Sequence, residues 1–272
     1  MTDNTKLNPS SSRLSVTVIS PHHDDAAFSA GALLKLLADA DFAITIVNCF
    51  TRSRFLPFYR SPEADPRSIR QTEDASFVAF LGTACRSQDL GLSDVQLRTG
   101  QGVRSMMQSG RLPPNERTTL CHLARRLEGS RIDGAVFVPL AAGSHTDHRI
   151  ACEAAIRAYR EGPVAFYEDL PYSARRPGQV HVALAAVQSM LETTLSPLTV
   201  NSEHGPLWKR AACACYPSQL SPEGVEKIVD YLQSVNGERI WVTPRFAQAA
   251  AGRYLEATAA LVCELAPQRT LP

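Results

Sequence analysis

Two short polar segments contain the residue types that a catalytic metal centre needs. Residues 21–25 read Pro-His-His-Asp-Asp, and residues 143–148 read Gly-Ser-His-Thr-Asp-His. A catalytic zinc ion takes three protein ligands from histidine and carboxylate side chains and leaves a position open for water. One of the adjacent Asp24 and Asp25 could bind the metal while the other accepts a proton from the attacking water, and a further histidine could stabilise the substrate oxyanion. The residue types predict metal-assisted hydrolysis.

The flanking sequence predicts that both segments lie at one edge of a sheet. Residues 14–19 form a β-branched run that ends at a Ser-Pro pair, and residues 135–139 form a second core strand before the later segment. Residues 27–40 have helical spacing and residues 43–50 are rich in β-formers, which gives a βαβ unit. Ligands of such sheets bind outside the carboxyl ends of the strands. We therefore expect an α/β fold, a Rossmann-like three-layer sandwich with a mostly parallel sheet and the active site at the C-terminal ends of its strands.

The rest of the chain continues this alternation. Helices are predicted over residues 66–81, 116–128, 148–160, 206–215, 222–235 and 246–265, and strands over residues 85–90, 164–167, 180–187 and 239–242. Residues 91–114 are rich in Gly, Ser and Gln and predict a long loop that could border the site. We expect a disordered tail over residues 1–12 and a single domain over residues 13–272, because the length suits one domain.

The balance of charged residues limits the classes of binding partner that the chain is expected to have. Lys and Arg number 28 and Asp and Glu number 27, so the chain has no global positive field for nucleic acid or an anionic membrane. No segment reads as a secretory leader or a transmembrane span, and the expected location is the cytoplasm. The seven cysteines form no C-x-x-C pair and are expected to be reduced core residues. A small-molecule substrate is expected, and a homo-oligomer is left open.

The two polar segments resemble the motifs of the PIG-L or LmbE-like deacetylases, which include N-acetylglucosaminyl-phosphatidylinositol deacetylase and the mycothiol and bacillithiol deacetylases. The family motif His-Pro-Asp-Asp-Glu is similar to residues 22–26, where His23 replaces the proline and Ala26 the glutamate, and the motif His-x-Asp-His is similar to residues 145–148. The resemblance implies a zinc site with three ligands: His22, Asp25 and His148. It also implies three further roles: Asp24 as the general base, His145 as the group that stabilises the oxyanion or protonates the leaving amine, and Asp147 as the carboxylate that orients a histidine.

Weaker matches extend along the chain. Arg70, three residues before Glu73, resembles an arginine that contacts the sugar in the family, and Asp94 resembles a substrate-contacting aspartate. The alternatives are a surface Arg–Glu pair and an aspartate that only turns the chain. Lys209 and residues 216–219 resemble a late segment that is expected to support the fold. Gly143 stands where the thiol-sugar deacetylases have a tyrosine, so any assistance that this tyrosine gives the oxyanion is absent here or comes from elsewhere. Residues 167–172 are a candidate substrate wall with a carboxylate available for hydroxyl groups.

The function implied by this resemblance is a metal-dependent hydrolase that removes an N-acetyl or other N-acyl group from an amino sugar, glycoconjugate or sugar-containing metabolite. Two alternatives stay open: an amidase for thiol-conjugate or peptide-like amides, and a protein that binds glycans or nucleotides without turnover. A binding protein would have no reason to keep Asp24 as a free base. Two histidines and one carboxylate suit Zn²⁺, and Fe²⁺ as well.

Overall fold

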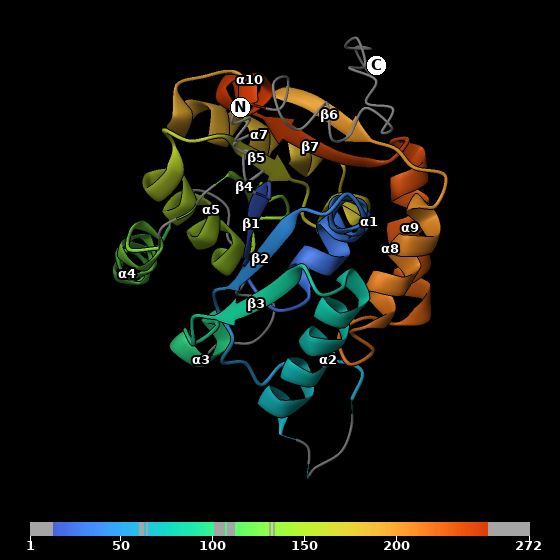
Figure 1. Cartoon of the computed structure of the whole chain (residues 1–272). Coiled ribbons are helices and arrows are strands. Elements are labelled where there is room, and N and C mark those ends of the chain that lie inside the picture. The colour runs from blue at the N-terminus through green and yellow to red at the C-terminus, as the bar shows by residue number, and fades with distance from the viewer. Residues whose placement is uncertain are drawn as a thin grey trace, which may run out of the picture.

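The structure is a computed structural model that describes residues 13–59, 63, 65–100, 107, 112–130, 132 and 134–249. Its centre is a seven-stranded sheet in the order β3-β2-β1-β4-β5-β7-β6 (Figure 1). Listed in that order, the strands are Cys85–Asp89, Ala43–Asn48, Ser15–Ser20, Ala135–Pro139, Val164–Tyr167, Glu238–Val242 and Ser196–Val200. The first five are parallel, and β7 is antiparallel to both of its neighbours. The predicted α/β fold with a mostly parallel sheet is confirmed.

Helices cover both faces of the sheet, as a three-layer sandwich requires. One face packs against α1 (Asp25–Asp39), α2 (Pro66–Leu81), α8 (Gly205–Ala214), α9 (Pro222–Ser234) and α10 (Pro244–Ala249). The other face packs against α4 (Glu116–Glu128), α5 (Thr146–Tyr159) and α7 (Gly178–Leu191). Two short helices, α3 (Val95–Thr99) and α6 (Tyr172–Arg175), complete the described elements. Within the described part of the chain, no helix is both long and apolar enough to cross a bilayer.

The two-residue period of the strands sorts their side chains between the two layers. In β4, Ala135 and Phe137 belong to the core beneath α1, whereas Val136 and Val138 belong to the core beneath α5. All four side chains are buried, which explains why the strand reads as a continuous apolar run. The segment that follows this strand must therefore emerge at the sheet edge, where the later polar motif lies.

The predicted strand over residues 180–187 is wrong, because these residues lie inside α7. Val180, Val187 and Leu191 are its buried side chains, a spacing that suits one face of a helix. The strand at this edge of the sheet is β6, which was not predicted and which contains Pro197, a residue unfavourable in a central strand. An edge strand tolerates this proline, since one side of its backbone has no neighbouring strand.

Several other predicted segments differ from the structure or lie partly outside the described residues. The predicted loop over residues 91–114 contains α3, while residues 101–106 and 108–111 lie outside the described residues. The helix predicted over residues 246–265 is described only as far as Ala249, and the predicted tail over residues 1–12 is not described. Cys121 is exposed, contrary to the expectation of a core residue, because it lies on the outer side of α4.

Helix α1 is interrupted in its middle by a buried ion pair. Ala30 departs from helical geometry with φ −132° and ψ 17°. Lys209 Nζ donates to the carbonyl oxygen of Phe28 at 2.7 Å, and the carboxylate of Glu238 accepts from the backbone N–H groups of residues 32 and 33 at 3.0 and 2.6 Å. Lys209 also pairs directly with Glu238. The pair therefore supplies partners that the interrupted helix loses, and it fixes the helix whose first residue is Asp25.

Candidate metal centre and active site

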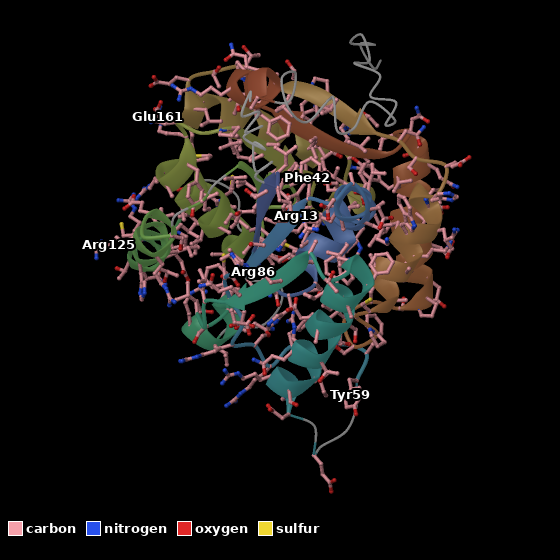
Figure 2. The ribbon with its side chains drawn as sticks, viewed as in Figure 1. Arg13, Phe42, Tyr59, Arg86, Arg125 and Glu161 are labelled. Carbon is pink, nitrogen blue, oxygen red and sulfur yellow. The ribbon has the colours of Figure 1, made fainter. Side chains whose placement is uncertain are left out.

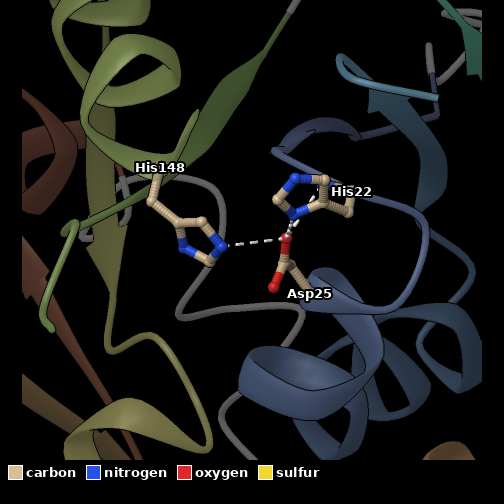
Figure 3. A group of neighbouring side chains, drawn as sticks. All are labelled: His22, Asp25 and His148. Carbon is tan, nitrogen blue, oxygen red and sulfur yellow. Dashed lines mark hydrogen bonds and ion pairs between the residues drawn. The ribbon is translucent and has the colours of Figure 1, made fainter. Parts of the chain in front are cut away.

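His22, Asp25 and His148 converge at the carboxyl ends of β1 and β4 (Figure 3). His22 follows β1, Asp25 begins α1, and His148 lies in the first turn of α5. His22 Nδ1 lies 3.0 Å from Asp25 Oδ2, and His148 Nε2 lies 3.3 Å from the same oxygen. The structure thus brings together the three residues that the resemblance implies as metal ligands.

The donor atoms of this trio fit a divalent metal ion. They all lie within 4.8 Å of one another, and the rings and the carboxylate are almost wholly buried. His148 Nε2 is buried without a hydrogen-bond partner among the described residues, although a buried ring nitrogen normally has one. An ion held between the three residues would give this nitrogen a ligand bond. Two imidazoles and one carboxylate suit Zn²⁺ or Fe²⁺.

A second carboxylate holds each of the two rings from its other nitrogen. Asp147 Oδ2 lies 3.1 Å from His22 Nε2, and Asp169 Oδ1 lies 2.6 Å from His148 Nδ1. Asp147 is fixed in turn by the backbone N–H of Val95 at 2.9 Å and by Arg98 at 2.7 Å. Such carboxylate–histidine pairs turn the remaining ring nitrogen toward a metal and raise its basicity.

Protonation of His22 competes with metal binding. Burial alone would lower the pKa of His22, but its hydrogen bonds with Asp147 and Asp25 raise that pKa to about 10. A ligand histidine must be neutral at the coordinating nitrogen, so a metal ion must displace this proton. The carboxylates of Asp25 and Asp147 therefore favour a positive charge beside His22. A divalent metal ion neutralises their negative charge more fully than a single proton does.

Asp24 faces the cavity beside the trio, and Arg70 forms an ion pair with it. The guanidinium of Arg70 is buried and reaches Asp24 from α2. Glu73 does not pair with Arg70. It accepts from Ser218 N at 2.8 Å and Ser218 Oγ at 2.7 Å instead. The alternative of a surface Arg–Glu pair is therefore wrong, and Arg70 is placed to hold the carboxylate of Asp24.

His145 has a defined tautomer. Its Nδ1 accepts a hydrogen bond from the backbone N–H of Asp147 at 3.2 Å, so that nitrogen carries no proton. Burial, followed by the positive charge of His148, lowers the pKa of His145 to about 3. The ring is consequently neutral near pH 7, with its proton on Nε2. A neutral imidazole of this tautomer is a hydrogen-bond donor to a substrate oxygen and a poor acid for a leaving amine.

Tyr172, at the start of α6, covers the two histidines of the later motif. Its ring lies edge-on to His148, with centroids 5.3 Å apart, and 6.1 Å from the ring of His145. Gly143 makes room for it, since a Cβ at that position would lie 2.5 Å from Tyr172 Cβ and the backbone φ there is +91°. Burial, with the charges of Asp25 and Asp24, raises the pKa of Tyr172 well above its usual value, so the hydroxyl stays protonated.

A cavity of about 300 Å³ is lined by His22, Asp24, Asp25, Arg70, His145, Asp147 and Tyr172. Asp94 also lines it and caps α3 by accepting from Leu97 N at 2.8 Å, which agrees with the chain-turning alternative for this aspartate. The rest of the wall is mixed in polarity and includes Phe55, Phe58, Arg175, Gln219 and Leu220. The cavity is at the small end of the range for small-molecule sites, about 300–1,000 Å³.

Sequence reasoning missed the roles that the geometry gives to Asp169 and Tyr172. Both lie in residues 167–172, which were expected only to form a substrate wall. The available signal was Asp169 two residues beyond a core strand, at the same edge as His148. Its pairing with a histidine 21 positions earlier depends on β4 and β5 being neighbours, which the sequence alone does not specify.

Known proteins are similar to this chain in sequence and in fold. A 2′-N-acetylparomamine deacetylase from Streptomyces fradiae is 30% identical over 164 residues, which span 58% of this chain and 58% of that relative. A solved teicoplanin deacetylase in its zinc-inhibited form has a TM-score of 0.63 and 21% identity, over 84% of this chain and 97% of that one. The A40926 pseudoaglycone deacetylase has a TM-score of 0.60 and 23% identity, over 86% and 99%. Residues 17–159, more than half of the 272, match the family described as GlcNAc-PI de-N-acetylase, and the chain therefore belongs to this PIG-L family.

Proposed function

We propose that this protein is a zinc-dependent hydrolase that removes an N-acetyl or other N-acyl group from an amino sugar or a sugar-containing metabolite. The observation that carries the proposal is the convergence of His22, Asp25 and His148 beside Asp24, a carboxylate outside the ligand trio that lines the same cavity as His22 and Asp25. The relatives are named as deacetylases of 2′-N-acetylparomamine, teicoplanin and the A40926 pseudoaglycone, which supports an N-acyl amide as the bond that is cleaved.

When bound by the three ligands, zinc would supply the acidity that makes a water molecule nucleophilic near neutral pH and would polarise the acyl carbonyl. Asp24 takes the proton of the attacking water. Arg70 holds the Asp24 carboxylate through its ion pair, so that the base is oriented toward the cavity. The same proton then passes from Asp24 to the amide nitrogen, because neutral His145 is a poor acid. The C–N bond breaks, and the products are a free amine and a carboxylate.

His145 and Tyr172 donate hydrogen bonds to the oxygen that becomes negative during the attack. His145 carries its proton on Nε2, and the protonated hydroxyl of Tyr172 belongs to the same cavity wall. Donors that are already oriented stabilise the oxyanion without reorganisation, which is the largest single contribution in many acyl-transfer enzymes. Tyr172 would thus supply, from a different element, the assistance that Gly143 cannot give.

The small cavity suits one sugar ring and its acyl group, with the remainder of a larger substrate outside. Arg70 and Asp94 provide a donor and an acceptor for ring hydroxyl groups, while Phe55 and Phe58 provide apolar surface. We assign substrate binding to these four side chains.

The test combines metal content with release of the acyl group. Purified protein is assayed with N-acetylglucosamine, 2′-N-acetylparomamine and teicoplanin, before and after chelation, with Zn²⁺ and Fe²⁺ added back separately. The proposal expects release of acetate, or of the carboxylic acid of another acyl group, that chelation abolishes and zinc restores. Restoration by Fe²⁺ alone would change the assigned metal. Bound metal with no release from any sugar amide would contradict the proposed substrate class, and turnover that is unaffected by complete chelation would contradict the mechanism.

A further inference from the structure

A second group of metal-binding side chains lies next to the proposed active site. His23 follows ligand His22, but its ring is buried against α2 and the end of β3, where Asp74 and Asp89 lie. His23 Nε2 is 3.0 Å from Asp89 Oδ1. Each of the three residues offers a donor atom within 4.8 Å of the other two. His23 stands where the family motif has proline, so this histidine is a feature of this chain that the proposed deacetylation does not use.

The charges around His23 are incompletely balanced. Asp74 is only 5% exposed, and within the described chain neither Asp74 nor Asp89 forms an ion pair with a lysine or arginine. Burial raises the pKa of Asp74, which reflects the cost of keeping its charge there. Two carboxylates beside one imidazole retain net negative charge even when the imidazole is protonated. A divalent cation would neutralise the group.

Several hydrogen bonds to these carboxylates are long. Asn48 Nδ2 reaches Asp74 Oδ1 at 3.2 Å and Asp89 Oδ1 at 3.3 Å, and the hydroxyl of Tyr216 reaches Asp74 Oδ1 at 3.3 Å. Hydrogen bonds to charged acceptors are normally about 2.7–2.9 Å. Ser87 also bonds to Asp74, and Gln71 bonds to Asp89 at 3.3 Å. A cation that binds the two carboxylates would compete mainly with these long hydrogen bonds.

Two buried polar atoms of the same group have no hydrogen-bond partner among the described residues: His23 Nδ1 and Asn48 Oδ1. The oxygen and nitrogen of an asparagine amide can exchange places without changing the shape of the side chain. Such an exchange would turn Asn48 Oδ1 toward the carboxylates, which is unfavourable beside bare negative charge and favourable beside a cation. Asn48 could in this way supply a fourth ligand.

We propose that His23, Asp74 and Asp89 form a second divalent-cation site, distinct from the catalytic trio. One imidazole and two carboxylates suit Zn²⁺. Asp89 is partly exposed, with 28% of its side chain accessible, and provides the route by which the ion enters. The ion would join the loop after β1 to α2 and β3, and so would brace the helix from which Arg70 reaches Asp24. The site is inferred independently of the proposed hydrolysis.

Counting metal ions in paired variants tests this site without any activity assay. His148→Ala removes a ligand of the catalytic trio, His23→Pro introduces the proline of the family motif, and His204→Ala changes an exposed histidine as a control. Each protein is saturated with zinc, dialysed, and analysed for zinc and protein content. We expect about two zinc ions per chain in the original protein and in the His204→Ala control, and about one in His148→Ala and in His23→Pro. The double variant that combines His23→Pro with His148→Ala should bind none.

Zinc should also raise the thermal midpoint of His148→Ala, but not that of the double variant, because an ion that binds only the folded state stabilises it. Asp89→Asn provides a second test if His23→Pro fails to fold, and it should likewise lose one ion. Loss of all bound zinc in His148→Ala would overturn the proposal, as would two retained ions in both His23→Pro and Asp89→Asn. Absence of turnover with two bound ions would contradict the proposed function and leave this site supported.

Discussion

Helix α1 carries two buried polar clusters that differ in how completely they satisfy their own atoms. At its middle, Lys209 and Glu238 neutralise each other and bond to the backbone groups freed at Ala30. At its beginning, Asp25 is surrounded by His22 and His148, and a ring nitrogen of His148 is left without a hydrogen bond among the described residues. The side chains of both clusters are largely buried, but only the second cluster contributes to the lining of a cavity.

This difference indicates a structural role for the Lys209 cluster and a ligand-binding role for the His22 cluster. A buried pair whose donors and acceptors all have partners stabilises one geometry and has nothing left to offer a ligand. A buried cluster with an open nitrogen, adjacent carboxylates and a cavity retains unused coordinating capacity. Substitutions in the Lys209 cluster should therefore act on the free energy of unfolding, and substitutions in the His22 cluster should act mainly on turnover and metal affinity.

Asp24→Asn should have the largest effect on turnover. Removing the general base is expected to lower kcat by about 10²–10⁴-fold, the range for general acid–base catalysis. The amide oxygen can still accept from Arg70, and Asp24 is not one of the proposed ligands, so the zinc content should be unchanged. Steady-state kinetics and metal analysis on the same preparation check both statements. Asp39→Asn, on the exposed end of α1, is the matched control. An Asp24→Asn protein with full activity would remove the proposed base.

Lys209→Met should act on stability instead. It leaves the buried carboxylate of Glu238 without its partner, and breaking a buried ion pair in this way costs about 3–5 kcal/mol. Lys35→Met, which removes a more exposed partner of Asp39, should cost about 0–1 kcal/mol. Urea unfolding of the two variants measures the difference. If the folded Lys209→Met protein lost turnover at unchanged stability, the distinction between the two clusters would fail.

Tyr172→Phe tests the donor that sequence reasoning missed. Loss of one oxyanion donor is expected to lower kcat by about 10²–10³-fold, with little change in the zinc content. Tyr159→Phe removes a hydroxyl that donates to Leu127 O at 2.7 Å, remote from the cavity, and should leave kcat unaffected. Equal kcat values for Tyr172→Phe and the original protein would exclude the hydroxyl from the reaction.

Sequence reasoning predicted the features that depend on local residue patterns and missed those that depend on contacts between distant segments. The motifs placed His22, Asp25 and His148 at the ends of core strands, and the strand order then brought them together. The role of Asp169 depended on a pairing between β4 and β5, and the space for Tyr172 depended on Gly143 from another loop. The strand predicted over residues 180–187 failed because a short apolar run has no unique period, and only tertiary packing made it a helix.

Asp169→Asn should have the smallest effect, because it changes the support of a ligand instead of the ligand itself. Asp169 lies 2.6 Å from His148 Nδ1 and fixes the ring with its other nitrogen toward Asp25. Replacing such a carboxylate typically lowers metal affinity by about 10–100-fold. Zinc affinity is measured by competition with a chelator, and saturating zinc should restore most of the turnover, which it cannot do for Asp24→Asn. Unchanged zinc affinity in Asp169→Asn would mean that packing against Tyr172 is sufficient to orient His148. The contrast between the two clusters would then depend on the proposed metal ligands, and not on the carboxylate behind His148.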